Sequence, residues 1–385
     1  MPSLRNFWFV GLVLALALSA LGQTMDSQYL MLTESTEALR AKAEQGDAEA
    51  QCAVGLRYQL GVRAEQDYGE ASKWLSRSAE QGNVKAKWAL GTAYEHGQGL
   101  PRDEAKALEF YVQAAEEGDS AAQYTLGVHV FYGEIVEQDY AVAEKWFRKA
   151  AEQDEAAAQF MIGLMYKQGL HVPQSDAEAV KWFRLAANEY DRDAQLALGR
   201  SYYWGKGVPR DYGEARKWFE QVVKIGTFIF VPEAALYLGF IHYHGYGVPQ
   251  DYSEAAKWFR GAAEEGHPEA QYSLAAMYSA GEAVALDALQ AAKWYRLAAE
   301  QGDSSAQLVL AKLYLNGEGL PENYIQVHKW SNLAASVGED GAAKLRQLVA
   351  EIMTREQIAK AQRLAREWKP KTWDELKEGL DAKIP

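Results

Sequence analysis

The chain has 385 residues, 48% hydrophobic and 24% charged, so it holds enough apolar material for a sizeable core. Its 53 acidic residues outnumber its 40 basic ones, and the resulting charge of −13 argues against binding to nucleic acid or to anionic lipid. The single cysteine, Cys52, excludes a disulfide within the chain, and we expect it to be a small apolar filler on a helix.

Residues 1–22 have the pattern of a secretory signal peptide. Arg5 precedes an uncharged run from Phe7 to Leu21, and Gly22 follows it. This run is shorter than the ~20 residues that a membrane-spanning helix needs. We therefore expect cleavage after Gly22 and a periplasmic or secreted protein. The alternative is an uncleaved N-terminal anchor, which would be the only association of this chain with a membrane.

The central part of the chain is a tandem repeat. An aromatic residue recurs at intervals of 36 residues, except for one interval of 40, at Trp74, Phe110, Trp146, Trp182, Trp218, Trp258, Trp294 and Trp330. A period of this length is typical of solenoids, in which each repeat buries its apolar face against its neighbours.

The first half of each repeat has the pattern of a helix. We number positions from a small residue, position 0, which is Gly55, Gly91, Gly127, Gly163, Gly199, Gly239, Ala275 and Ala311. Ala at −5, an aliphatic residue at −1 and usually Tyr at +3 share one helix face, and the small residue would let a partner helix approach closely. Glycine at +6 in all eight repeats predicts a left-handed residue that ends this helix. Four repeats continue as Gly-x-Gly, but no strand precedes them, which argues against a dinucleotide site.

The second half of each repeat predicts another helix. In most repeats, Asp, Asn or Ser at +12 and Glu or Gln at +15 have the spacing of a capping box, as in Asp67 with Glu70. We interpret these acidic residues as helix caps rather than as catalytic pairs. Ala at +16, the aromatic residue at +19 and mostly Ala at +23 and +24 form an inward stripe, which places the +19 ring in the core. Gly at +27 ends the helix in six repeats.

These motifs resemble the Sel1-like repeat family, which is related to the tetratricopeptide repeats. The resemblance rests on Ala-x-x-x-Leu-Gly-x-x-Tyr-x-x-Gly followed by Asp-x-x-x-Ala-x-x-Trp-x-x-x-Ala-Ala-x-x-Gly, and it covers eight repeats in residues 48–340. Val130 and His242 depart from the Tyr position, and Phe110 replaces a Trp. The resemblance implies an all-α fold, a right-handed α/α superhelical solenoid of about eight two-helix repeats. Residues 34–47 would form an N-terminal capping half repeat, and residues 341–385 C-terminal capping helices and a tail, where Thr354 and Gln357 have capping-box spacing.

A candidate binding surface follows from the face of the first helix that carries positions −3, +1, +4 and +5. In stacked helix pairs this face lines the concave surface. Large side chains recur there, and those that we predict to bind a partner are Trp88, Tyr124, Phe131, Phe160, Arg200, Tyr203, Trp204, Phe240, Tyr243, His244 and Tyr272. An exposed apolar stripe of this length usually marks an interaction site. The alternative is that a tightly wound superhelix buries part of it between successive first helices.

A four-residue insertion separates the fifth and sixth repeats and contains the apolar segment from Thr227 to Val231. It is either a local change in the pitch of the superhelix or a contact for a partner.

No catalytic or metal-binding motif occurs in the sequence. His-Glu-x-x-His, Gly-x-Ser-x-Gly and Ser-x-x-Lys are absent. His242 and His244 would point about 200° apart on a helix, so they could not share a metal. We therefore expect neither an enzyme nor a bound metal or cofactor.

The function that we predict is an exported protein–protein interaction scaffold, which holds a peptide or a partner domain on its concave aromatic surface. The family resemblance implies the same role. The alternative is a glycan- or peptidoglycan-binding component of the cell envelope or exopolysaccharide machinery, because aromatic faces also stack on sugar rings. The sequence does not identify the partner.

Overall fold

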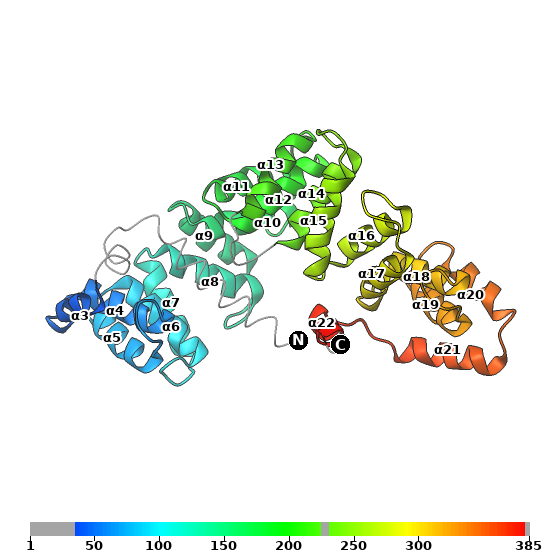
Figure 1. Ribbon diagram of the computed structural model, residues 1–385. Helices are drawn as coiled ribbons and strands as arrows, with labels where there is room; N and C mark the ends of the chain where they lie inside the picture. Colours follow the sequence, from blue (N-terminus) through cyan, green and yellow to red (C-terminus); the bar gives the residue numbers. More distant parts are fainter. Residues whose placement is uncertain (1–34, 225–230, 382–385) are drawn as a thin grey trace. The chain divides into compact units, whose positions relative to one another are not determined.

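The computed structural model describes residues 35–224 and 231–381, and within these ranges it contains twenty α-helices and no strand (Figure 1). The predicted signal peptide and residues 227–230 of the insertion lie outside the described residues. The chain divides into two compact units. Unit 1 comprises the residues up to Ser201 and residues 205–209, and unit 2 comprises Tyr202–Trp204 and the chain from Arg210 onward. No helix in the described ranges is both long enough and apolar enough to cross a membrane.

Unit 1 is a series of helix pairs, and between residues 48 and 188 each first helix packs against the second helix of its own repeat, as each second helix does against the next first helix. Its helices are α3 (Thr36–Glu44), α4 (Ala48–Leu60), α5 (Tyr68–Glu80), α6 (Val84–His96), α7 (Glu104–Glu116), α8 (Ser120–Tyr132), α9 (Tyr140–Ala151), α10 (Ala156–Gln168) and α11 (Asp176–Asn188), followed by most of α12 (Arg192–Trp204). The lone helix α3 packs against α4 through the buried Leu39 and Ala43.

Unit 2 contains helix pairs of the same kind, and three further helices follow the last pair in the described part of the chain. Its helices are α13 (Tyr212–Lys224), α14 (Pro232–His244), α15 (Tyr252–Glu264), α16 (Pro268–Ala280), α17 (Ala288–Glu300), α18 (Ser304–Asn316), α19 (Tyr324–Ser336), α20 (Ala342–Ala350), α21 (Arg355–Glu367) and α22 (Trp373–Asp381). Together the two units confirm the predicted all-α fold of tandem two-helix repeats.

The core of each repeat is filled from position +20 rather than from +19. The +20 side chains are all buried, and they are Leu75, Tyr111, Phe147, Phe183, Phe219, Phe259, Tyr295 and Ser331. Of the +19 rings, only Trp74 and Trp330 are buried, and the other six are half-buried. Five of these six pack against the core clusters, so the core prediction for +19 holds there only in part: Phe110, Trp146, Trp182, Trp258 and Trp294. The reason is rotation by one residue, about 100° around the helix, which aims +20 and not +19 at position 0.

The small residue at position 0 makes room for that +20 side chain, as predicted. A Cβ on Gly127 would lie 2.6 Å from the ring of Phe147, and a Cβ on Gly91 would lie 2.6 Å from the ring of Tyr111. At Gly91 and Gly127 the two positions are therefore coupled, because the +20 ring occupies the space that a Cβ at position 0 would take.

The ends of the first helices follow the predicted pattern. Glycine at +6 is left-handed at the end of each of the eight first helices, with φ between 67° and 72°. The second glycine of Gly-x-Gly serves packing: a Cβ on Gly99, at φ +71°, would overlap the carbonyl oxygen of Tyr68 at the start of α5. The motif thus lets a loop contact the preceding repeat.

The predicted capping boxes are only half formed in the second helices. The Asp67 side chain accepts a hydrogen bond from the Glu70 N–H at 3.0 Å, but the Asp67 N–H donates to the Tyr58 carbonyl at 2.9 Å. The same backbone bond from +12 to +3 occurs in all eight repeats. The Glu70 carboxylate therefore has no N–H to accept from and pairs with Lys73 at 2.8 Å. A complete box forms at Thr354 and Gln357, as predicted.

Buried glutamines join successive repeats. The Gln271 side chain donates from Nε2 to the Ala263 carbonyl at the end of the preceding second helix, at 3.1 Å, and the same bond occurs at Gln51, Gln123, Gln159, Gln195 and Gln307. Each of these carbonyls also accepts from the N–H three residues further along the chain, so the glutamine adds a second hydrogen bond that joins the two repeats. This position, −4, gave no signal in the apolar pattern because glutamine is polar.

Cys52 lies fully buried on α4 among Leu75, Ala86 and Ala89, which confirms its predicted role as an apolar filler. Burial raises the pKa of its thiol to about 12, so the thiol stays protonated and unreactive at neutral pH.

Candidate functional site

Four aromatic rings form a cluster that recurs along the array and explains which predicted site residues are buried. The +4 ring meets the +5 side chain, the +13 tyrosine that opens the second helix, and the +20 ring. In α8 and α9 these are Phe131, Tyr132, Tyr140 and Phe147, and in α12 and α13 they are Tyr203, Trp204, Tyr212 and Phe219, with ring centroids 4.9 to 6.5 Å apart. The cluster covers the +4 ring on three sides.

The predicted exposure is therefore wrong for three residues. Phe131 and Tyr203 at +4 are 7% and 6% exposed, because the +13 and +20 rings enclose them. Tyr124 at −3 is also 6% exposed, since its ring packs 6.0 Å from that of Phe147. By contrast, Trp204 at +5 is 51% exposed, and His244 at +5 is exposed as well. Position +5 is the part of the stripe that reaches solvent.

The other predicted residues are half-buried: Trp88, Phe160, Arg200, Phe240, Tyr243 and Tyr272. The Trp88 indole Nε1–H donates to Thr125 Oγ1 at 3.1 Å, which links α6 to α8. The Tyr243 hydroxyl donates to Glu282 Oε2 at 2.8 Å, and partial burial followed by this bond raises the pKa of Tyr243 to about 12. Phe160 and Tyr272 pack against the +20 rings Phe183 and Tyr295.

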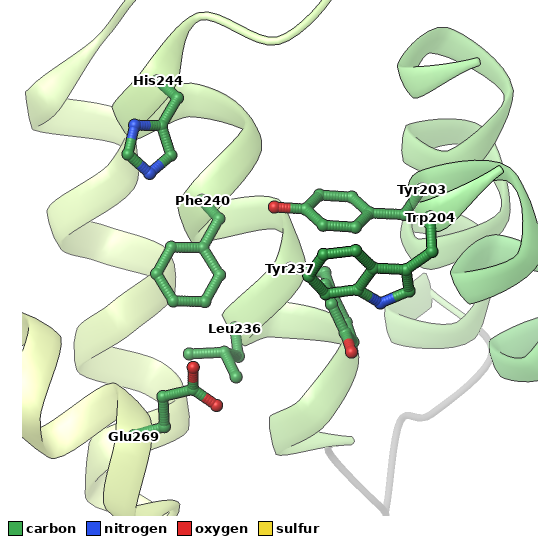
Figure 2. A pocket seen from close by; sticks show the side chains of 7 residues that line it. All are labelled: Tyr203, Trp204, Leu236, Tyr237, Phe240, His244 and Glu269. Atoms are coloured by element: carbon green, nitrogen blue, oxygen red, sulfur yellow. The ribbon is translucent and has the colours of Figure 1, made fainter. Parts of the chain in front are cut away.

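A cavity of about 280 Å³ lies in unit 2, and it brings four of the predicted residues together. We call it the Trp204 pocket. Its lining residues come from the end of α12, from α14 and from the start of α16, and they are Tyr203, Trp204, Leu236, Tyr237, Phe240, His244 and Glu269. In Figure 2 the rings of Tyr203 and Trp204 face the side chains of α14 across the cavity, with Glu269 at its lower edge.

The Trp204 pocket combines aromatic walls with negative charge. Its lining includes one carboxylate, that of Glu269, and neither lysine nor arginine. Desolvation raises the pKa of Glu269, and the nearby carboxylates of Asp303 and Glu233 raise it further. Burial also raises the pKa of Tyr203, so its hydroxyl remains a protonated donor at neutral pH.

Three lining residues were missed by the sequence prediction. Leu236 lies at −3 on the predicted face and is four residues from Phe240, so its position gave a signal that was not used. Tyr237 lies at −2, outside the face, yet its ring is 5.0 Å from that of Tyr203. Glu269 belongs to the following repeat, and only the fold brings it to the pocket.

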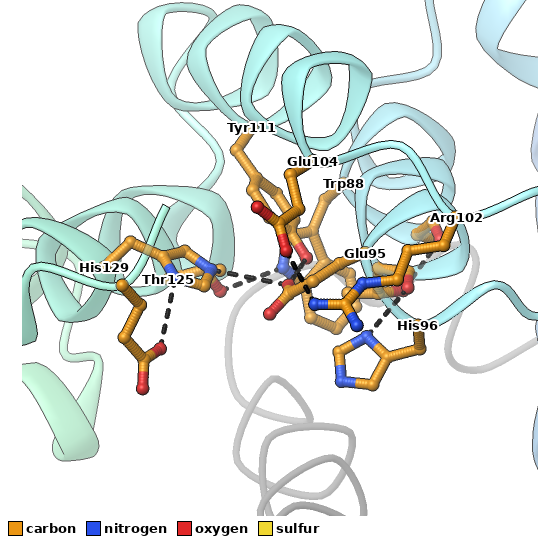
Figure 3. Close-up of polar contacts among 11 residues, drawn as sticks. Trp88, Glu95, His96, Arg102, Glu104, Tyr111, Thr125 and His129 are labelled. Atoms are coloured by element: carbon orange, nitrogen blue, oxygen red, sulfur yellow. Dashed lines mark hydrogen bonds and ion pairs between the residues drawn. The ribbon is translucent and has the colours of Figure 1, made fainter. Parts of the chain in front are cut away.

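A second polar group of residues lies in unit 1, buried between α6, α7 and α8 (Figure 3). The Tyr111 hydroxyl donates to Glu95 Oε2 at 2.6 Å, and His129 Nε2 lies 3.4 Å from the same oxygen. Burial acts to raise the pKa of Glu95, but the contacts from His129 and Tyr111 outweigh it and hold the pKa below its usual value. His129 is 3% exposed, so this cluster links helices and offers no open site. No group of metal-ligating side chains occurs within the described parts of the chain.

Comparison with known proteins agrees with this architecture. The model of the Sel1 repeat matches eight segments, at residues 48–83, 84–119, 120–155, 156–191, 192–221, 232–267, 268–303 and 304–339. The chain belongs to the Sel1 repeat family. The matched segments leave out residues 222–231, which correspond to the end of the fifth repeat and the insertion.

Solved structures of other Sel1 repeat proteins are similar to this one. A Sel1 repeat protein from Oxalobacter formigenes is 31% identical, with a TM-score of 0.58 over 84% of this chain and 94% of that chain. The protective antigen c5321 of uropathogenic Escherichia coli is 27% identical, with a TM-score of 0.38 over 92% of this chain and 98% of that chain. The curated proteins give no match. Sel1 repeat proteins generally act as scaffolds for protein–protein interaction, and their fold is typically not enzymatic.

Proposed function

We propose that this Sel1 repeat protein binds a peptide segment or partner domain at the Trp204 pocket. The observation that carries the proposal is Trp204 itself, a large aromatic side chain that is 51% exposed beside a cavity walled by other rings. Tryptophan is among the residues that most often dominate the binding energy of protein interfaces. The rigid first helices hold the rings in place before a partner arrives, which lowers the entropic cost of binding.

The test uses the two exposed +5 residues of the pocket. Residues 23–385 serve as bait for envelope proteins, and mass spectrometry identifies what is captured. We expect the double variant Trp204→Ser, His244→Ser to fold normally and to lose the captured partner. The matched control is Tyr132→Ser, His96→Ser, which changes the same repeat positions in unit 1. If the pocket variant captures the partner as well as the control variant does, the binding surface lies elsewhere. If the pocket variant loses only the binding of a polysaccharide, glycan binding is favoured instead.

We also propose that the protein is exported. The support is the sequence of residues 1–22, with Arg5 before an uncharged run and Gly22 after it. A fusion of residues 1–30 to a reporter that is active only outside the cytoplasm should be active. N-terminal sequencing should find Gln23 or a residue close to it at the start of the mature chain, whereas an intact Met1 form in the membrane fraction would indicate an uncleaved anchor.

A further inference from the structure

The Trp204 pocket has the composition of a site for a positive charge. Tyr203, Trp204, Tyr237 and Phe240 contribute aromatic rings, and Glu269 contributes the only carboxylate of the lining. The negative face of an aromatic ring attracts a cation within about 6 Å of its centroid, and most strongly when the ring is that of tryptophan. Rings and a carboxylate around one cavity therefore favour a cationic group over a neutral or anionic one.

The charges around the pocket point the same way. Glu233 at the start of α14 and Asp303 at the start of α18 both act on Glu269 through their negative charge. His267, which precedes α16, has its pKa lowered by burial and so adds no positive charge at neutral pH. A cation that entered the pocket would meet the carboxylate of Glu269 directly, and Glu233 and Asp303 add negative charge around that carboxylate.

The same chain already uses this chemistry. On α19, the Lys329 Nζ lies 3.8 Å from the ring centroid of Trp330, and the Glu300 carboxylate is among the charges that act on it. On α9, Lys149 Nζ lies 4.2 Å from the ring of Trp146. These lysines show that the fold places an ammonium group over a tryptophan ring, although burial and the nearby Lys371 and Arg296 outweigh Glu300 and lower the pKa of Lys329.

We infer that the Trp204 pocket takes a lysine or arginine side chain of the bound peptide, with Glu269 as its counter-charge. The inference rests on the proposed function and specifies the chemistry of the partner. The cavity of about 280 Å³ has room for one long side chain and part of its backbone, but not for a folded element. The aliphatic stem would pack on Leu236 and Phe240, and the charged end would lie between the rings and Glu269.

The test uses short peptides of defined charge and the full mature chain labelled with 5-fluorotryptophan. The Trp204 signal is assigned from a Trp204→Phe variant. The probes are Ac-Ala-Lys-Ala-NH2, Ac-Ala-Arg-Ala-NH2 and the matched norleucine and glutamate peptides. We expect the lysine or arginine peptide to shift the Trp204 signal saturably, at concentrations roughly tenfold below any effect of norleucine, a difference of about 1.4 kcal/mol.

Glu269→Gln isolates the counter-charge. Glu269 is exposed and the change keeps its shape, so the variant should fold, and it should weaken binding of the basic peptides by roughly tenfold while leaving norleucine unaffected. Glu265→Gln, at an exposed residue that does not line the pocket, is the control and should bind as the wild type does.

Two results would overturn the inference. Equal effects of the lysine and norleucine peptides would show that charge is not recognised, and a shift by tetramethylammonium but by no peptide would assign the pocket to a free quaternary amine. Failure of the proposed function looks different: the partner captured by the mature chain would survive Trp204→Ser, His244→Ser. The double variant could also lose a partner whose own lysines and arginines are not needed for binding. That result would contradict this inference and leave the proposed function standing.

Discussion

The ring clusters around Phe131 and Tyr203 occupy the same positions two repeats apart in the sequence, yet they differ in what the next repeat supplies. Phe131 belongs to a continuous core cluster with Met161 at −2 of the following repeat. Tyr203 instead meets Tyr237 at −2, at 5.0 Å, and Tyr246 at +7, at 6.3 Å. The flexible side chain of methionine can fill irregular gaps, whereas the Tyr237 and Tyr246 rings meet Tyr203 in tilted and edge-on arrangements. The two regions thus share the same helix framework, and the Trp204 pocket occurs where tyrosines replace other residues at positions such as −2.

The largest expected effect tests what the two regions share. Phe219→Ala and Phe147→Ala should each destabilise the protein by ~3–5 kcal/mol, because both rings are fully buried and leave a cavity against the opposite helix. Trp218→Ala should cost less, since Trp218 is half-buried. Urea denaturation followed by circular dichroism measures all three. A larger loss from Trp218→Ala would restore position +19 as the core residue.

An intermediate effect concerns the caps of the helices that carry the two clusters. Burial raises the pKa of Asp191, the N-cap of α12, to about 7, and it also raises the pKa of Asp119, the N-cap of α8. Between pH ~4 and 7 the folded chain therefore holds a proton that the unfolded chain has lost, so stability should fall as the pH rises through this window and level off above it.

Asparagine variants isolate this contribution. The amide oxygen of Asp191→Asn can still accept the hydrogen bond from the Ala194 N–H, but it does not titrate. The melting temperature of Asp191→Asn relative to wild type should therefore increase from pH 4 to pH 8, and Asp119→Asn should change in the same direction. A difference that stays constant with pH would show that Asp191 titrates normally.

The smallest effect concerns a predicted site residue with a structural contact. Thr125→Val removes the acceptor of the Trp88 Nε1–H bond and should destabilise unit 1 by ~0.5–1.5 kcal/mol. Thr125→Ser keeps the hydroxyl and is the control. Neither variant should alter capture of a partner, because Trp88 lies outside the Trp204 pocket. Loss of capture by Thr125→Val alone would show that the unit 1 surface binds too.

The sequence by itself determined the repeat, its two helices and most of their ends. The 36-residue period, the left-handed glycines at +6 and the caps at +12 are local signals, and each acts within a few residues of where it is read. The small residue at position 0 also predicted a close helix approach, and Gly127 against Phe147 confirms it. Position −5 was read correctly as buried because it shares one helix face with the aliphatic residue at −1 and the small residue at 0.

Only the tertiary structure decided which rings stay exposed and what surrounds them. Adjacent residues of a helix, such as +19 and +20 or +4 and +5, point about 100° apart. Which of the two faces the core depends on how the neighbouring helices pack against that helix. Tyr203 and Trp204 are adjacent residues of the same chemical class, yet one is enclosed by Tyr212 and Phe219 and the other reaches solvent. Glu269 joins them from another repeat, at a distance in sequence over which local periodicity carries no information.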